Sequence, residues 1–304
     1  GRAGNSTVGW GGTVADAVRI QNPPGSVLSP CISIAGDNRF QVGLQTFPYQ
    51  IGTGGVTALQ TGGGTQRANA IAEILAGSQP SPFATEYRAV MNRAQSVFDV
   101  LSGPLTLGNP VGTINTTFPP QNSLGDQLRM VARMIKVSRD TGQGIEHQRQ
   151  IYFVRLGGFD MHDGLMSEGP TGHAGLLQRV SEAMLAFWNA LIEIGAQNEV
   201  TTFTMSEFAR TLSSNGDGSD HAWGSNAFVM GGAVNGGRLY GAYPDLVLNG
   251  PVSLDRGQQI PQIGVEQYAA TLARWLGVTD DTTLDTIFPN LGQFASRNLG
   301  FMAP

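Results

Sequence analysis

Apolar residues recur at three- and four-residue steps in several stretches of the chain, a pattern that predicts amphipathic helices. The clearest stretch is residues 124–139, where Leu128, Val131 and Ile135 share one face and Ser123 stands where a capping residue is expected. Similar patterns predict helices at residues 13–19, 66–75, 83–101, 177–191 and 265–276. Gly195 and Gly277 follow the last two, at positions where helix-ending glycines are common.

Short apolar runs bounded by glycine or polar residues predict strands at residues 31–35, 151–156, 200–205 and 227–230. The strand at 151–156, the helix at 177–191 and the strand at 200–205 follow one another as a βαβ unit. We therefore expect these two strands to lie parallel and side by side in one sheet. This predicts an α/β protein with a mostly parallel sheet flanked by helices, in a single domain over residues 1–304.

Polar residues concentrate in two segments that follow predicted strands. The first is Gly-Gly-Phe-Asp-Met-His-Asp at residues 157–163, and the second is a long polar loop that joins the strands at 200–205 and 227–230. In the predicted sheet, Asp160 and Glu207 emerge at the same carboxyl edge, where open α/β folds bind ligands. Long polar loops of this kind are usually functional.

Carboxylate and imidazole groups gather in these segments. Three of the four histidines lie in or beside them, namely His162, His173 and His221. His147 precedes the strand at 151–156 and is expected at the surface. Asp160 and His162 are two residues apart, and Asp220 adjoins His221. Carboxylates and neutral imidazoles together bind zinc, manganese or iron, so the pattern indicates a divalent metal site.

The residue pattern leaves other interpretations open. Asp160 and Asp217 can cap turns, His221 can bond a backbone carbonyl, and Glu207 can pair with Arg210 or another arginine. His173 can be a ligand or a residue that caps or packs the start of a helix.

Composition narrows the function classes. A net charge of -5 with a single lysine leaves no basic cluster for nucleic acid, and 42 glycines with 13% charged residues predict many loops.

The single cysteine, Cys31, excludes an internal disulfide and is expected in the core. No G-x-S-x-G motif occurs, and the glycine clusters at 52–55 and 62–64 lack the spacing of phosphate-binding loops. No run of about 18 apolar residues predicts a transmembrane segment.

Several segments resemble the bacterial exported family catalogued as domain of unknown function 1501. The most specific are residues 157–162 (GGFDMH), 201–211 (TTFTMSEFART), 218–224 (GSDHAWG) and 228–246. The resemblance also takes in residues 9–12, 34–36, 255–257, 267–277 and 288–291, and so covers nearly all of the chain. That family belongs with the alkaline phosphatase and sulfatase superfamily.

The resemblance implies an alkaline-phosphatase-like core with a divalent metal at its carboxyl edge. Zinc is the first expectation, with manganese, calcium or iron as alternatives, and the substrate is a small anionic ester. Together with the residue pattern it gives the metal ligands Asp160, His162, Glu207, Asp220 and His221, with His173, Asp163, Asp217 and Arg210 as additional candidates. The expected function is that of an exported, periplasmic or extracellular, hydrolase of phosphate or sulfate esters.

Two departures from the family pattern favour another function. Phe208 stands where a second metal-binding histidine is expected. Full-length relatives also carry an export signal and a segment before residue 9 that holds the superfamily nucleophile. This chain starts at Gly1 without a methionine, so we expect it to be the C-terminal part of a longer chain. The alternative is a non-catalytic exported binding or structural protein that keeps the fold.

Overall fold

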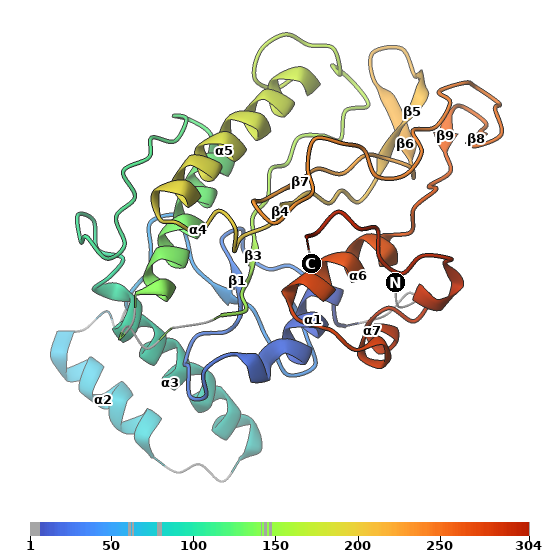
Figure 1. The fold of residues 1–304 in the computed structure, drawn as a ribbon. Helices are drawn as coiled ribbons and strands as arrows, with labels where there is room; N and C mark the ends of the chain where they lie inside the picture. The colour runs from blue at the N-terminus through green and yellow to red at the C-terminus, as the bar shows by residue number, and fades with distance from the viewer. Residues whose placement is uncertain are drawn as a thin grey trace.

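A three-stranded parallel sheet lies at the centre of the molecule. The computed structural model describes residues 7–59, 62, 64–77, 81–140, 142, 145 and 148–303. The strand order of the sheet is β2 (Tyr49–Gln50), β1 (Cys31–Ser33), β3 (Ile151–Phe153). Helices α4 and α5 lie on one side of it, and α1, α6 and α7 lie on the other (Figure 1). The chain thus combines helices and strands as predicted, although its sheets are small.

Most helices match the sequence pattern closely. The predicted ranges correspond to α2 (Gly64–Ala76), α3 (Pro82–Ser102), α4 (Ser123–Arg139), α5 (His173–Glu193) and α6 (Val265–Leu276). The predicted helix at 13–19 starts earlier, as α1 (Trp10–Val18), and continues into a 3-10 turn, η1 (Arg19–Gln21). The pattern did not predict α7 (Asp281–Ile287) or the 3-10 turn η2 (Leu291–Gln293).

The cap of α4 differs from the expectation by one residue. Asn122 is the capping residue, and its Oδ1 accepts a hydrogen bond from the backbone N–H of Gly125 at 3.2 Å. Ser123 is the first helical residue instead. The other end of the Asn122 amide donates to the carbonyl of Arg179 at 2.8 Å, so one buried side chain both starts α4 and ties it to α5.

Two apolar cores hold the sheet from its two sides. The larger contains Ile32 of β1 together with side chains of α3, α4 and α5 such as Leu101, Val131 and Phe187. The smaller joins α1, α6 and α7. Cys31 is fully buried in β1 as predicted, and burial raises the pKa of its thiol to about 12, which leaves it unreactive. The helices therefore fix both faces of the sheet, and the segments that follow the strands remain available for a site.

The predicted pairing of the strand at 151–156 with the strand at 200–205 is wrong. β3 pairs with β1, while β4 (Thr202–Phe203) pairs antiparallel with β7 (Val229–Met230) in a separate two-stranded sheet. A backbone hydrogen bond from Thr204 to Phe228, at 3.0 Å, extends that pairing. Val200 and Met230 still pack against the larger core, so both segments reach the same interior without joining one sheet.

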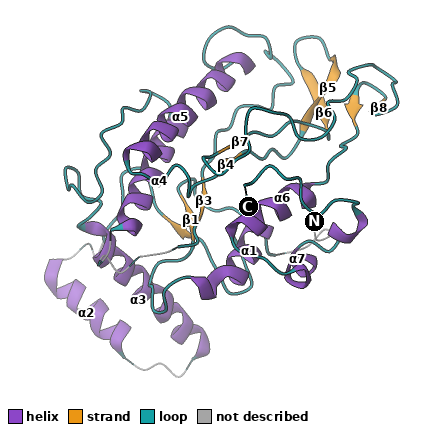
Figure 2. Cartoon of the chain, in the orientation of Figure 1, coloured by secondary structure: helices purple, strands orange, loops and turns teal. Residues whose placement is uncertain are grey.

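The segment predicted as a long loop between residues 205 and 227 contains a β-hairpin. Its strands are β5 (Ala209–Ser214) and β6 (Ser219–Ala222), which pair antiparallel with Arg210 opposite His221. A second small hairpin, β8 (Ser253–Leu254) and β9 (Gln258–Gln259), lies against it. The N–H groups of Leu212 and Ser213 in β5 donate hydrogen bonds to the carbonyls of Gly257 and Arg256 and so connect the two hairpins. These strands form a unit of their own at one end of the molecule (Figure 2).

Helices α2 and α3 extend away from the body of the molecule (Figure 1). α2 buries none of its described residues, and α3 buries only Val97 and Leu101 near its end. Within the part of the chain that the structure describes, no helix is both long and apolar enough to cross a membrane.

Candidate metal centre

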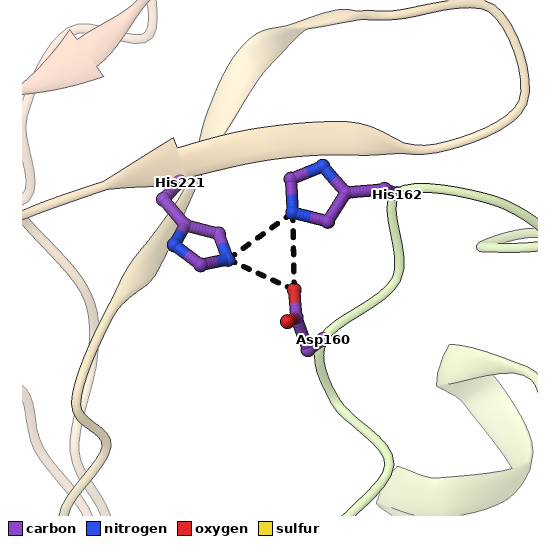
Figure 3. A group of neighbouring side chains, drawn as sticks. All are labelled: Asp160, His162 and His221. Carbon is purple, nitrogen blue, oxygen red and sulfur yellow. Dashed lines mark hydrogen bonds and ion pairs between the residues drawn. The ribbon is translucent and has the colours of Figure 1, made fainter.

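Three side chains converge at one point beside the β5–β6 hairpin. Asp160 and His162 come from the loop after β3, and His221 comes from β6 (Figure 3). Oδ1 of Asp160 lies 2.8 Å from Nε2 of His221 and 3.2 Å from Nε2 of His162, and the two Nε2 atoms are 3.2 Å apart. The side chains are 56, 51 and 49% exposed in the order Asp160, His162, His221. One face of the group is therefore open to solvent.

The hairpin turn brings the two segments together. The N–H of Ser219 donates to the carbonyl of Met161 at 3.3 Å, and the Asn215 amide donates to the carbonyl of His162 at 3.0 Å. Gly218 lies so close that an added Cβ would come within 2.4 Å of the Met161 carbonyl oxygen. Only glycine permits this approach, so the turn sequence Asn-Gly-Asp-Gly sets the distance between the loop and His221.

The donor atoms fit a divalent metal. Ligands about 2.0–2.1 Å from a tetrahedral zinc ion are about 3.3 Å from one another. Two of the three separations here, at 3.2 Å, are close to this value, and the third, at 2.8 Å, is shorter. Two imidazole lone pairs aimed at the same point repel each other unless a proton or a cation lies between them. Two imidazoles and one carboxylate suit zinc, manganese or iron, whereas calcium prefers oxygen ligands.

Arg210 connects the two segments that carry the donors. Its Nη2 donates to Oδ1 of Asp160 and to the carbonyl of Phe159, both at 2.8 Å, and its Nη1 donates to the carbonyl of Ser219. The side chain is only 17% exposed. The hydrogen bond from His221, and then that from Arg210, hold the pKa of Asp160 below its usual range. Asp160 is thus a carboxylate with a fixed orientation.

Phe208 forms one wall of the group. Its ring stacks on the His221 ring at a centroid distance of 4.2 Å and an interplanar angle of 8°, and the Arg210 guanidinium carbon lies 5.0 Å from its centroid. Phe208 therefore holds the imidazole of His221 by stacking.

Asp220 lies behind His162 and outside the group of three donors. Its Oδ1 is 3.4 Å from Nδ1 of His162, the ring nitrogen that faces away from the convergence point, and its Oδ2 pairs with Nη1 of Arg256. Partial burial of Asp220 would raise its pKa, but hydrogen bonding from Asn215 and the charge of Arg256 outweigh this and lower it. An ionised Asp220 orients the His162 ring, an arrangement typical of metal sites.

The remaining predicted residues lie elsewhere. Glu207 is exposed, and among the described residues it makes no hydrogen bond or ion pair, with Arg210 or otherwise. Asp163 is exposed as well. Asp217 accepts a hydrogen bond from the N–H of Gly164 at 3.0 Å and so supports the loop, while His173 begins α5 with its ring 6.2 Å from that of Phe159. His147 lies outside the described residues.

Arg256 is the one charged residue of the centre that the sequence pattern did not predict. It follows β8 and reaches Asp220 from a different hairpin, and its Nη2 also donates to the carbonyl of Ser214 at 2.8 Å. Nothing in its local sequence marks a site, because its neighbours Asp255 and Gly257 form a tight turn. Backbone hydrogen bonds from Leu212 and Ser213 of β5 to the carbonyls of Gly257 and Arg256 bring it near.

We expect Asp220→Ala to weaken zinc binding by about 10- to 100-fold, because His162 loses the carboxylate that orients its ring. Asp220→Asn keeps an acceptor oxygen beside Nδ1 and should lose less. The dissociation constant for zinc, measured by competition with a chelator, checks this prediction. Equal affinities of Asp220→Ala and the unmodified protein would contradict the orienting role, and a loss as large as that of His221→Ala would indicate a direct ligand.

Comparison with protein families gives one match. Residues 141–256 match the family described as "Protein of unknown function (DUF1501)". No curated protein and no solved structure matches the chain. The matched segment contains all three donor residues together with Arg210, Asp220 and Arg256, so the part of the chain that builds this centre is similar to the DUF1501 family.

Proposed function

We propose that the protein binds one divalent metal ion, zinc in the first place, through Asp160, His162 and His221, and that it hydrolyses phosphate or sulfate esters. The convergence of three donor atoms within 3.2 Å of one another carries this proposal. Three protein ligands with open positions are typical of catalytic zinc sites, whereas structural zinc sites are closed by four. A bound metal supplies a Lewis acid for an ester oxygen.

The charges around the donors support an anionic substrate. Asp160 is paired with Arg210 and Asp220 with Arg256, so these four charges cancel one another. A bound dication then leaves the centre with a net charge of about +2, which attracts phosphate or sulfate groups. The resemblance to the alkaline phosphatase and sulfatase superfamily supports the same substrate class. Export of the protein is part of the proposal and rests on that resemblance alone.

The second candidate function is metal or ligand binding without turnover. Among the described residues, no hydroxyl group bonds Asp160, His162 or His221, so the centre has no side-chain nucleophile in place. Phe208 occupies the place of a second metal-binding histidine and is stacked on His221. These two observations favour a binding or structural protein that keeps one metal.

Metal removal and replacement separate the two functions. We expect the purified protein to bind about one zinc ion per chain. The zinc-loaded form should hydrolyse 4-nitrophenyl phosphate or 4-nitrophenyl sulfate, and chelation or Asp160→Ala should abolish the reaction. His173→Ala, which changes a histidine outside the centre, should leave metal content and rate unchanged. Stoichiometric metal with neither ester hydrolysed would favour the binding protein. Failure to bind any metal would reject the metal-dependent hydrolase and leave a binding or structural role that needs no metal.

A further inference from the structure

Trp223 is the exposed tryptophan of this chain. Of the four tryptophans, Trp10, Trp188 and Trp275 are partly buried, whereas Trp223 is 61% exposed. It stands two residues after His221, directly beyond β6. A large aromatic side chain exposed beside a cluster of metal-binding groups offers a surface on which the aromatic part of a ligand can stack.

The backbone places Trp223 on the same face of the strand as His221. Ala222 is buried. A Cβ added to Gly224 would lie 3.0 Å from the Cβ of Gln259, which is buried as well. His221 and Ala222 are the last residues of β6, and the N–H of Gly224, just after the bend at Trp223, donates to the carbonyl of Gln259 at 2.9 Å. Side chains alternate along the strand, so the exposed residues 221 and 223 lie on the face opposite to the buried Ala222, with their Cα atoms about 6.5–7 Å apart.

Phe208 continues this face on the neighbouring strand. Phe208 directly precedes β5, whose first residue, Ala209, pairs with Ala222, and the Phe208 ring stacks on His221. The imidazole thus has an aromatic neighbour on this face of the hairpin. The backbone of Trp223 lies about one strand repeat beyond that of His221, about the length of a phenyl ring with its ester oxygen.

We propose that Trp223 is the binding platform for the leaving group of the substrate, and that the substrates are aryl esters of phosphate or sulfate. This inference rests on the proposed function, since the anionic end of the ester must lie at the metal. The aromatic ring of the leaving group then stacks on the indole in an offset or edge-to-face arrangement. Alkyl esters of the same charge reach the metal but leave the indole in water.

Two phosphonates of equal charge test the platform without catalysis. Phenylphosphonate and methylphosphonate both carry the anionic group on a carbon–phosphorus bond that the proposed reaction does not cleave. We expect the zinc-loaded protein to bind phenylphosphonate about tenfold more tightly, as one aromatic contact of this kind predicts. Trp223→Ala should remove the preference and leave the affinity for methylphosphonate within about twofold, while Trp223→Phe should keep most of it. Isothermal titration calorimetry gives both affinities.

Tyr87→Ala is the matched control, because Tyr87 is 67% exposed on the remote helix α3. It should bind both phosphonates as the unmodified protein does. Equal affinities for the two phosphonates in the unmodified protein, or a preference that survives Trp223→Ala, would overturn the platform and leave the metal-bound anion site intact. If zinc binds but neither phosphonate does, the ester hydrolase function fails and the platform fails with it.

Discussion

His221→Ala is expected to reduce the affinity for zinc by more than about 100-fold, the largest effect of any single change in this centre. Changes of residues that only orient a ligand cost about 10- to 100-fold, and His221 contributes a donor atom itself. The remaining pair, Asp160 and His162, comes from a single loop and offers two ligands. The dissociation constant of the purified variant, measured by chelator competition on folded protein, checks this.

The pH dependence gives a second test of the same role. Both imidazoles must be neutral to bind a metal, so the zinc affinity of the unmodified protein should fall as the pH is lowered, and it should fall less steeply in His221→Ala because one fewer proton competes. His173→Ala serves as the control, with the slope of the unmodified protein. If His221 only supported the fold, its replacement would lower stability and leave the metal content unchanged.

Arg210→Met is expected to lower the free energy of unfolding of the metal-free protein by about 2–4 kcal/mol, since two backbone carbonyls and the Asp160 carboxylate lose the hydrogen bonds and the charge of the guanidinium. Those acceptors belong to Phe159, Asp160 and Ser219, so the loss should loosen the loop from the hairpin. Methionine keeps much of the side-chain volume, which separates the lost hydrogen bonds from a cavity effect. Urea unfolding monitored by circular dichroism measures the change.

Arg210→Lys and Arg238→Met complete this comparison. Lysine keeps the charge, but a single ammonium group cannot reproduce the planar contacts to three acceptors, so the variant should recover only part of the stability. Arg238 is exposed, and its replacement by methionine should cost no more than about 0.5 kcal/mol. Similar losses in Arg210→Met and Arg238→Met would show that Arg210 does not connect the two segments.

The helices were predictable because each buries one face, and the apolar residues of that face recur at three- and four-residue steps within the helix itself. The stripe of Leu128, Val131 and Ile135 on α4 is such a local signal, and α6 matches its predicted range residue for residue. Strand partners carry no such local signal. The runs at 151–156 and 200–205 were identified as strands, but β1 occupies the position beside β3 and β7 pairs with β4.

The difference between local signals and the pairing of distant strands also decided which site residues were predicted correctly. Asp160, His162 and His221 were predicted from residue chemistry and from the family resemblance, and the structure brings them together. Glu207 was predicted beside Asp160 from the expected sheet and from the resemblance. It lies outside the group, and the strand before it, β4, pairs with β7 instead of β3. The hairpin at 209–222 carried a turn signal, Asn-Gly followed by Asp-Gly, that points to an antiparallel pair. The many glycine, serine, asparagine and aspartate residues of the segment favour a loop instead.

The separation of the donors along the chain has a consequence for how this region holds together. Asp160 and His221 are 61 residues apart, and α5 lies between them. A metal ion that binds both therefore acts as a reversible cross-link, closing a long loop much as a disulfide would in a chain whose single cysteine cannot form one. If the proposed ion stabilises only the closed form, its concentration will control how often the hairpin separates from the loop.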